Sequence, residues 1–373
     1  MEKHLHVVCL DVPYPADYGG AFEMFFKIRA LHKEGVKIHL HCFDYGRGKQ
    51  DILNKYCVEV KYYDRMEGHK GLSMRLPYIV SSRANPRLLE TLKKDNYPIL
   101  FEGIHTTFFV HEKALENRKI FIRMHNAEHL YYKQLASQSK SLWKKIYYRN
   151  ESRLLYKYEK KIAASATILA ISEKEEKKFR DEYKATNVKY LPAFIGWDFP
   201  LCKEGVGSFC LYHGNLSVAE NAKAATWLLK NVFNDLPIPF VVAGKNPSAQ
   251  LGKLAHKQNH TCLVANPSEK EMQDLIQKAQ INILPAFTET GIKFKLLNSV
   301  FCGRHIIAND SMAQGTHLES ACHIATGAVA FKSLLSQLYR KSFDEEEIRL
   351  RENLLHHFYN NHQNARDLIK WIW

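Results

Sequence analysis

The stretch INILPAFTETGIKFKLLNSVFCGRHIIAND, residues 281–310, decides the fold. It opens with an apolar run that predicts a buried strand and closes with a second such run, His305–Ala308. Between the two runs, Gly291 precedes a helical pattern that carries two lysines. A strand, a helix and a further strand in this order predict a parallel β-α-β unit.

The same alternation of strand and helix patterns continues along the whole chain. Helical patterns such as residues 21–35 and 220–234 separate apolar runs, which are typical of parallel strands covered on both faces. The other predicted strands are His4–Val12, Lys37–Phe43, Val58–Tyr63, Ile99–His105, Ile120–His125, Thr167–Ile171, Val188–Pro192, Phe209–His213, Phe240–Ala243 and Thr261–Val264. The sequence therefore predicts an α/β protein with parallel, doubly wound sheets.

Chain length favours two domains. The chain has 373 residues, and residues 192–208 combine proline and glycine with no periodicity, as linkers do. We expect an N-terminal Rossmann-like domain over residues 1–195 and a C-terminal one over 208–345, with their parallel sheets facing across a cleft. Residues 346–373 are expected to be helical and to pack back onto the body.

Composition narrows the class of protein. Hydrophobic residues make up 46% and charged residues 25%, as in globular proteins. No apolar run is long enough to span a bilayer, and the N-terminus has no signal-peptide pattern. The eight cysteines form no CxxC pair, which indicates reduced thiols in a cytoplasmic protein.

The net charge of +14 is the most informative part of the composition. Residues 139–161 combine many lysines and arginines with apolar residues at helical spacing, including Leu142, Ile146, Leu155 and Tyr158. A solvated helix with an ordinary core-facing stripe is the favoured interpretation. Contact with an anionic membrane surface stays open as the second.

Two predicted loops have the features of phosphate-binding sites. In α/β sheets, ligands bind at the carboxyl ends of strands, where helix N-termini offer free N–H groups. Gly19 and Gly20 open a helix after the first strand, and paired glycines let a phosphate approach the backbone; a plain tight turn is the alternative. In the second loop, Lys295 and Asn298 share one side of the helix, and Lys293 must either snorkel or reach past the helix tip; ordinary surface lysines that aid solubility are the alternative.

At this point the chain resembles a known family. The segments LYHGNLSVAENAKAATWLLKNVF, VVAGKNPS and LPAFTETGIKFKLLNSVFCGRHIIAND are similar to the C-terminal half of GT-B glycosyltransferases of the family 4 type, the glycosyl transferases group 1. PYPADYGGAFEMFFKIRALHKEGVKIHL, FIRMHNAEHLYYKQLA and ATILAISEKEEKKF resemble the N-terminal half. In that architecture the last helix often crosses to the N-terminal domain.

The resemblance implies roles for individual residues. Gly19 and Gly20 would face the donor diphosphate, and His125 would line the reaction centre. Glu289 is the second catalytic candidate, beside the sugar. The other implied donor-binding residues are Lys245, Gly291, Lys293 and Lys295 for the diphosphate, and Asn215, Thr290 and Asn298 for the nucleoside and sugar. Asn298 stands where the family usually has a glutamate, and Asn215 and Asn221 stand roughly where it has arginine and lysine.

Three N-terminal residues are singled out by position alone. His105 and Glu128 lie at predicted strand ends where an acceptor would bind, and a helix cap or loop hydrogen bond explains each equally well. Arg123 lies inside an apolar strand, where a lone charge needs a partner. It either pairs with an acidic neighbour or points into the cleft.

The resemblance implies a retaining glycosyltransferase that needs no metal or other cofactor. Its co-substrate would be a nucleotide-diphosphate-sugar of unknown base, and no Asp-x-Asp pair for a metal is present. The acceptor would be a glycan or a lipid-linked sugar in surface polysaccharide biosynthesis. The protein would be cytoplasmic, with a peripheral position on the inner face of the membrane left open, and no nucleic-acid motif is present.

Two alternatives stay open. One is a nucleotide-sugar 2-epimerase with the same fold, and the other is a nucleotide-sugar-binding protein of weak or no activity. The replacement of the usual glutamate by Asn298 prompts the second.

Overall fold

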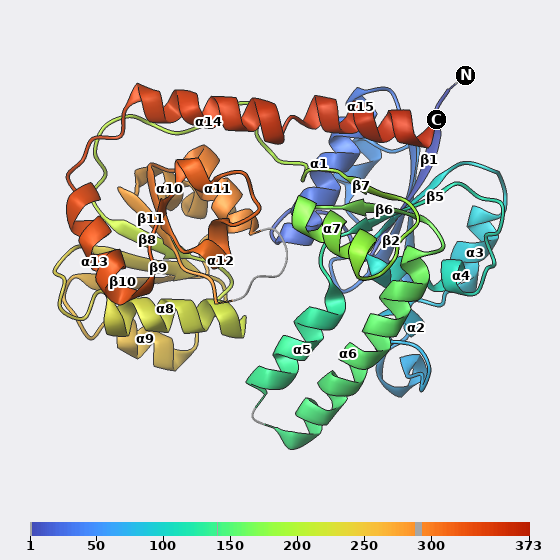
Figure 1. Cartoon of the computed structure of the whole chain (residues 1–373), viewed down its shortest axis with the longest axis horizontal. Coiled ribbons are helices and arrows are strands. Elements are labelled where there is room, and N and C mark those ends of the chain that lie inside the picture. Colours follow the sequence, from blue (N-terminus) through green and yellow to red (C-terminus); the bar gives the residue numbers. More distant parts are fainter. Residues whose placement is uncertain (1, 140, 288–292) are drawn as a thin grey trace. The chain divides into compact units, whose positions relative to one another are not determined.

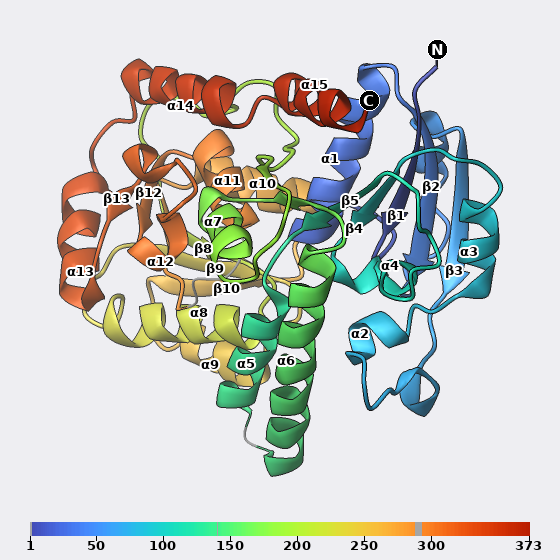
Figure 2. The same ribbon diagram turned by 45° about the vertical axis from the view of Figure 1, so that its right-hand side comes forward.

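The computed structural model describes residues 2–139, 141–287 and 293–373, and they divide into two compact units (Figures 1 and 2). Unit 1 runs to Gly196 and takes in Tyr359–Trp373 as well. Unit 2 begins at Trp197 and ends at Phe358. The change from one unit to the other comes inside the linker predicted at 192–208.

Unit 1 is built on a parallel sheet with the order β3-β2-β1-β4-β5-β6-β7. Its strands are β1 (His4–Cys9), β2 (Lys37–Asp44), β3 (Glu59–Asp64), β4 (Ile99–Glu102), β5 (Ile120–Met124), β6 (Thr167–Ala170) and β7 (Val188–Tyr190). Chain order reverses direction between β1 and β4, and such a switch point is where ligands bind in doubly wound sheets.

Helices cover both faces of this sheet. They are α1 (Gly19–Lys33), α2 (Tyr78–Ser81), α3 (Pro86–Leu92), α4 (Phe108–His111), α5 (Glu128–Gln138), α6 (Leu142–Ala163), α7 (Glu173–Asp181) and α15 (Asn361–Ile372), with short 3₁₀ turns at Asp51–Lys55, Gly68–Gly71 and Ile104–Thr106. Two apolar clusters fill the space between helices and sheet, one around Leu5, Leu31 and Leu368 and one around Phe101 and Ile162.

Unit 2 repeats the design with the order β10-β9-β8-β11-β12-β13, again parallel throughout. Its strands are β8 (Cys210–His213), β9 (Phe240–Gly244), β10 (Thr261–Ala265), β11 (Ile281–Leu284), β12 (His305–Ala308) and β13 (His323–Ile324). Its helices are α8 (Ala219–Asn231), α9 (Ala249–Ala255), α10 (Glu269–Lys278), α11 (Phe294–Cys302), α12 (Asp310–Ala313), α13 (Gly327–Leu338) and α14 (Glu345–Phe358), with a 3₁₀ turn at Glu319–Ala321.

The last two helices divide between the units. The segment predicted at 346–373 is helical, but α14 belongs to unit 2 and α15 to unit 1. On α15, His362 and Arg366 bond the Glu34 carboxylate at 2.6 and 3.1 Å, and Leu368 and Ile372 are buried in the core beside α1. The final helix therefore packs on the N-terminal unit.

All twelve predicted strands form, so the fold class is confirmed, with three differences of detail. The predicted strand Ile99–His105 ends at Glu102, because Gly103 turns the chain with a φ of 77° and places His105 in a 3₁₀ turn. Strand β13 was not predicted, since two paired residues give no periodic signal. The core-facing stripe of residues 139–161 is correct for Leu155 and Tyr158, but wrong for Leu142 and Ile146, which are 70% and 51% exposed.

Candidate functional site

The carboxyl ends of β8 and β9 meet at a contact that only glycine allows. A Cβ atom on Gly244 would lie 1.8 Å from the carbonyl oxygen of Gly214. Immediately after this contact, Asn215 forms a turn in which its Oδ1 accepts hydrogen bonds from the Ser217 N–H (3.1 Å) and hydroxyl (2.7 Å). This close contact between two backbones fixes the carboxyl ends of β8 and β9, and the predicted donor-binding residues lie at this edge of the sheet.

Lys295 lies at this edge, on the first turn of α11. Its Nζ donates to Asn221 Oδ1 at 2.6 Å and to the Tyr212 hydroxyl at 3.4 Å, and it lies 5.1 Å from the centre of the Tyr212 ring. Burial lowers the pKa of Lys295 to about 8; Glu220 opposes this shift and Lys293 adds to it. Among the described residues, both hydrogen bonds of the ammonium group go to neutral oxygens rather than to a carboxylate, so added negative charge would stabilise it.

Lys293 precedes α11 and lies near the same carboxylate. Its Nζ is 3.7 Å from Glu220 Oε1, and burial lowers its pKa while Glu220 opposes the change. Two lysines thus share the neighbourhood of one carboxylate on α8. Excess positive charge at a helix N-terminus is the electrostatic requirement for binding a diphosphate.

Asn298 and His213 extend the polar edge inwards. The Oδ1 atom of Asn298 is buried and has no hydrogen-bond partner among the described residues. His213, at the end of β8, lies with its Nε2 2.9 Å from the Ser299 hydroxyl, and burial together with Lys295 lowers its pKa to about 3. A buried amide oxygen without a donor is available for a ligand hydroxyl or N–H.

The other donor-side predictions have mixed outcomes. Lys245 follows β9 and its side chain is exposed near this edge, while its carbonyl accepts from the Leu216 N–H at 2.8 Å. Glu289, Thr290 and Gly291 lie outside the described residues. The structure thus groups Lys293, Lys295 and Asn298 on α11 and leaves the preceding loop untested.

The carboxyl edge of unit 1 carries a closed cluster of charges. Lys27 Nζ lies 2.8 Å from Glu23 and 2.7 Å from Glu102, and Arg123 donates to Glu23 at 2.9 and 3.1 Å. These four side chains are 0–1% exposed. Burial would raise the pKa of Glu23, but Arg123 and Lys27 outweigh it and lower that pKa. Arg123 therefore pairs with an acidic neighbour, the first of its two predicted alternatives.

His125 lies at the rim of this cluster, directly after β5. Its Nε2 is 3.1 Å from Glu102 Oε2, and its side chain is 12% exposed. A carboxylate only accepts hydrogen bonds, so Nε2 carries a proton, while Nδ1 lies 3.9 Å from Glu23 Oε2 and has no hydrogen-bond partner among the described residues. Glu102 thus orients the ring, as carboxylates do for catalytic histidines.

Glu23, Glu102 and His125 could also be taken for metal ligands, because their ligand atoms lie within 4.8 Å of one another. The Lys27 ammonium already bonds both carboxylates at under 3 Å. It occupies the place that a cation would take, so this cluster is a poor metal site.

Of the two acceptor-side candidates, Glu128 is buried and His105 is half-buried. Burial, with Arg83 and His125, lowers the pKa of His105, whose Nδ1 has no hydrogen-bond partner among the described residues. Glu128 begins α5, and burial, followed by the charges of Glu159 and Glu175, raises its pKa to about 8. A carboxyl group of this pKa is protonated at neutral pH and can donate a hydrogen bond.

Gly19 and Gly20 form the first turn of α1, as the sequence predicts. A Cβ atom on Gly20 would lie 2.9 Å from the Tyr18 ring, whose hydroxyl donates to Asp11 Oδ2 at 3.1 Å. The need for glycine at position 20 is therefore explained by the packing of Tyr18.

Sequence reasoning missed Glu23, Lys27 and Glu102. A faint signal exists, because Glu23 and Lys27 are a charged pair at i and i+4 on the apolar side of a helix. Glu102 ends an apolar strand and shows no such pattern. Only the packing of α1 over β4 and β5 brings the three side chains together.

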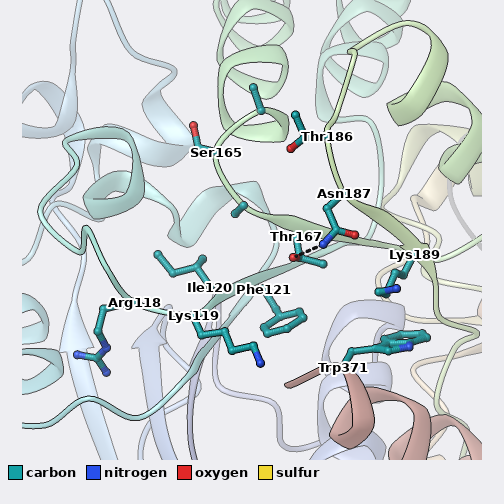
Figure 3. A pocket seen from close by; sticks show the side chains of 12 residues that line it. Arg118, Lys119, Ile120, Phe121, Ser165, Thr167, Thr186, Asn187, Lys189 and Trp371 are labelled. Carbon is teal, nitrogen blue, oxygen red and sulfur yellow. Dashed lines mark hydrogen bonds between the residues drawn. The ribbon is translucent and has the colours of Figure 1, made fainter. Parts of the chain in front are cut away.

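A hollow of about 380 Å³ lies at the opposite edge of the unit 1 sheet (Figure 3). Its walls include Ile120 and Thr167, the first residues of β5 and β6, and Lys189, whose Nζ lies 5.3 Å from the centre of the Trp371 ring. It is lined by amino ends of strands, where α/β enzymes do not carry out chemistry. We do not assign it to the candidate site.

No helix of the described residues is both long and apolar enough to cross a membrane.

Known proteins that resemble this chain agree with the fold described above. Residues 208–340 match the family described as glycosyl transferases group 1. An uncharacterized 44.6 kDa protein in a cps region of Klebsiella pneumoniae is 27% identical over 330 residues, which are 83% of this chain and 84% of that protein.

Solved structures show the same fold at low identity. Sucrose-phosphate synthase from Thermosynechococcus elongatus has a TM-score of 0.71 at 13% identity, covering 99% of this chain and 98% of that one. TarM of S. aureus, in complex with fondaparinux, alpha-GlcNAc-glycerol and UDP, has a TM-score of 0.66 at 10% identity and covers both chains fully. The match of residues 208–340 to the glycosyl transferases group 1, together with the arrangement of both sheets, gives this chain the GT-B glycosyltransferase fold.

Proposed function

We propose that the enzyme transfers a sugar from a nucleotide-diphosphate-sugar that binds at the carboxyl edge of unit 2. The observation that carries this proposal is Lys295, a largely buried ammonium group bonded to the neutral oxygens of Asn221 and Tyr212. A diphosphate beside it would supply the missing negative charge. UDP in the complex of the similar TarM structure supports a nucleoside diphosphate as the ligand class.

The reaction breaks the bond between the anomeric carbon and the diphosphate, so negative charge develops on the leaving nucleotide. Lys293, Lys295 and the N-terminus of α11 would stabilise that charge, with Lys245 and Gly291 as further diphosphate contacts. We assign this stabilisation to the lysines and propose a retaining reaction without a metal ion. Asn298, with its buried Oδ1, is suited to a donor hydroxyl; Asn215 and Thr290 complete the proposed nucleoside and sugar contacts.

In unit 1 the proposed catalytic group is His125. When the ring is neutral, its Nδ1 can accept a hydrogen bond from a sugar hydroxyl, while Glu102 holds the other ring nitrogen. Glu289 is the second proposed catalytic residue, and Gly19 and Gly20 are proposed to contact the diphosphate through the backbone. His105 and Glu128 are proposed to bind the acceptor.

We place the reaction in surface polysaccharide biosynthesis, with a glycan or lipid-linked acceptor. The relative in a cps region supports this setting, because cps denotes capsular polysaccharide. The fold alone does not separate this role from that of a nucleotide-sugar epimerase or of a binding protein.

Calorimetric titration tests the donor site. UDP, GDP, CMP, ADP and their common sugar conjugates are first screened by the rise in melting temperature that a ligand of the folded state causes. The best ligand is then titrated into Lys295→Ala, whose affinity should fall by about 1–3 kcal/mol, and into Lys278→Ala, an exposed control lysine on α10.

The outcomes separate the functions. Binding that is lost in Lys295→Ala and followed by sugar transfer supports the proposal. The same binding without transfer to any acceptor would favour the binding protein, and equal affinity in both variants would remove Lys295 from the site.

The hairpin of α5 and α6 is proposed to contact an anionic membrane surface. Figures 1 and 2 show these two helices side by side, extending away from the sheet of unit 1. The first turns of α6 expose Leu142 (70%), Trp143 (83%) and Ile146 (51%) beside the exposed Lys144 and Arg149. Exposed aromatic and aliphatic residues among basic ones suit the headgroup region of an anionic bilayer.

Vesicle sedimentation tests this contact. The enzyme should bind vesicles containing phosphatidylglycerol more tightly than neutral ones, and salt should weaken the binding. The double variant Trp143→Ser/Ile146→Ser should bind at least tenfold more weakly. Val329→Ser, which removes an 84% exposed apolar residue from unit 2, should leave it unchanged. Equal retention of both variants would disprove the role of the hairpin.

A further inference from the structure

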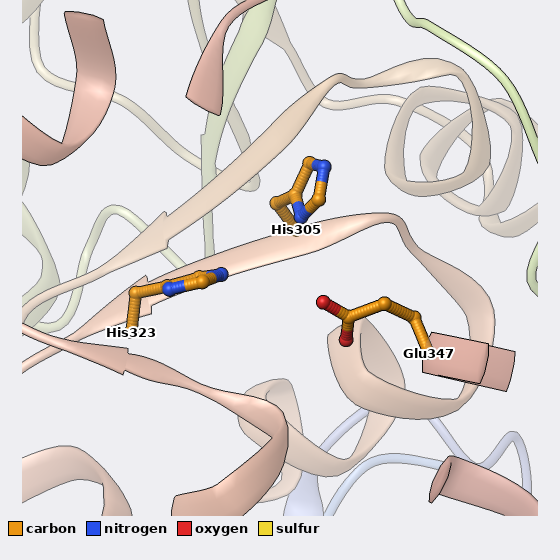
Figure 4. A group of neighbouring side chains, drawn as sticks. All are labelled: His305, His323 and Glu347. Atoms are coloured by element: carbon orange, nitrogen blue, oxygen red, sulfur yellow. The ribbon is translucent and has the colours of Figure 1, made fainter. Parts of the chain in front are cut away.

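Three side chains of unit 2 that are far apart in sequence converge at one point. His305 begins β12, His323 begins β13, and Glu347 lies in the first turn of α14. One ligand atom from each lies within 4.8 Å of the others. Figure 4 shows the His323 ring and the Glu347 carboxylate directed towards each other below the His305 ring. Two imidazoles and one carboxylate are a common protein ligand set for zinc.

The hydrogen bonding of His305 fixes which of its nitrogens can bind a metal. Its Nε2 lies 3.2 Å from the Lys341 carbonyl oxygen, which only accepts, so Nε2 carries the proton. Nδ1 therefore has a lone pair, and it is buried with no hydrogen-bond partner among the described residues in a side chain that is 1% exposed. Metal-binding histidines usually donate their other N–H to a carbonyl or a carboxylate in this way.

We propose that His305 Nδ1, His323 and Glu347 bind one Zn²⁺ ion, with water as the fourth ligand. Tetrahedral zinc with bonds of about 2.1 Å needs its ligand atoms about 3.4 Å apart. The ligand atoms must therefore close in by up to about 1.4 Å from a spacing of up to 4.8 Å. His323 and Glu347 are both half-buried, so side-chain rotation can supply this movement.

Lys341 and Arg351 are the positive charges that act on His323, and Arg351 also acts on His305. Arg351, four residues after Glu347, is fully buried, and its guanidinium donates to the carbonyl oxygens of Val300 (2.9 Å), Gly303 and Arg304. These carbonyl dipoles offset much of its charge, but it still lies close enough to oppose a cation. We therefore expect micromolar rather than nanomolar affinity.

The location assigns the metal a structural role. His305 and His323 lie at the amino ends of their strands, whereas Lys295 lies at the carboxyl edge of the same sheet, so zinc would take no part in the proposed transfer. Strand β13 pairs with β12 through only two residues, Ile307 with His323 and Ala308 with Ile324. An ion shared by β12, β13 and α14 would anchor this edge of the sheet, because metal binding adds to folding free energy.

Isothermal titration of Zn²⁺ into the untagged, chelator-treated enzyme tests the site. The wild type should bind one equivalent with micromolar affinity, and its melting temperature should rise with Zn²⁺. Co²⁺ should give the visible absorption of a tetrahedral site. His323→Ala and Glu347→Gln should each lower the affinity at least tenfold and abolish the thermal shift.

Glu346→Gln is the matched control, because it removes an exposed carboxylate from the same turn of α14. It should bind zinc like the wild type. Glu347→Gln keeps the size of a half-buried side chain, so it tests the site even if His323→Ala fails to fold. The proposal is overturned if the wild type shows no saturable binding, or if Glu347→Gln binds as tightly as Glu346→Gln.

Discussion

The two sheets present charged groups at their carboxyl edges in opposite ways. In unit 1, Glu23 and Glu102 are matched by Lys27 and Arg123 within 2.7–3.1 Å, and all four are excluded from solvent. In unit 2, Lys293 and Lys295 share the neighbourhood of Glu220. Buried charges that are fully paired hold a structure, whereas buried cations in excess create a demand for an anion. The comparison predicts a structural role for the first set and ligand binding for the second.

Breaking the closed cluster should have the largest effect. Arg123→Met removes both hydrogen bonds to Glu23 and leaves a fully buried carboxylate with one cation, so the free energy of unfolding should fall by about 3–5 kcal/mol. Urea unfolding measures this change. Arg180→Met, which removes an exposed pair with Glu176 on α7, should cost no more than about 0.5 kcal/mol. Similar costs for the two variants would contradict a structural role for the cluster.

The raised pKa of Glu128 in unit 1 should make the stability of the protein depend on pH. Its pKa of about 8 in the folded protein exceeds that of an unfolded glutamate, so its contribution to stability is complete below about pH 4.5. Between about pH 4.5 and 8 this contribution is lost, by up to about 1.4 kcal/mol per pH unit. Glu128→Gln should therefore gain stability over the wild type as pH rises from 5 to 8, whereas Glu116→Gln, an exposed control, should not. Parallel curves for all three proteins would refute the raised pKa.

Diphosphate binding at the carboxyl edge of unit 2 should also depend on pH. Lys295 is protonated below its pKa of about 8 and attracts a diphosphate only in that form. Affinity for the nucleotide diphosphate should fall by up to tenfold per pH unit, about 1.4 kcal/mol, as pH rises above 8. Titration calorimetry of Lys295→Met should give a weaker and flatter profile. An unchanged slope in this variant would assign the pH dependence to another group.

Removing the Glu220 carboxylate should have the smallest effect. Glu220→Gln makes the edge more positive, so diphosphate affinity at pH 6.5, where Lys295 is still protonated, should rise a few-fold, or by about 0.5–1 kcal/mol. Equilibrium binding at low salt measures it, because salt screens partly exposed charges. Weaker binding in this variant would mean that Glu220 positions the lysines rather than opposing the ligand.

Part of the site could be predicted from the sequence, because the side of a helix on which a residue lies depends only on local spacing. Lys295 and Asn298 share one helix side in any α-helix, and Gly19 and Gly20 follow an apolar strand at the point where a helical pattern begins. The sequence did not show which side chains surround each site residue, and those neighbours set its pKa. The lowered pKa of Lys295 depends on Asn221 and Tyr212, which lie on α8 and β8.

The sequence by itself determined the order of strands and helices, the parallel character of both sheets and the position of α11, because hydrophobic periodicity acts over a few residues at a time. Tertiary structure alone decided which charges are paired. Lys27 meets Glu102 across 75 residues, Arg123 meets Glu23 across 100, and His305, His323 and Glu347 meet from three elements. Such contacts depend on how strands are ordered and helices packed, and a linear pattern of residues does not contain that information.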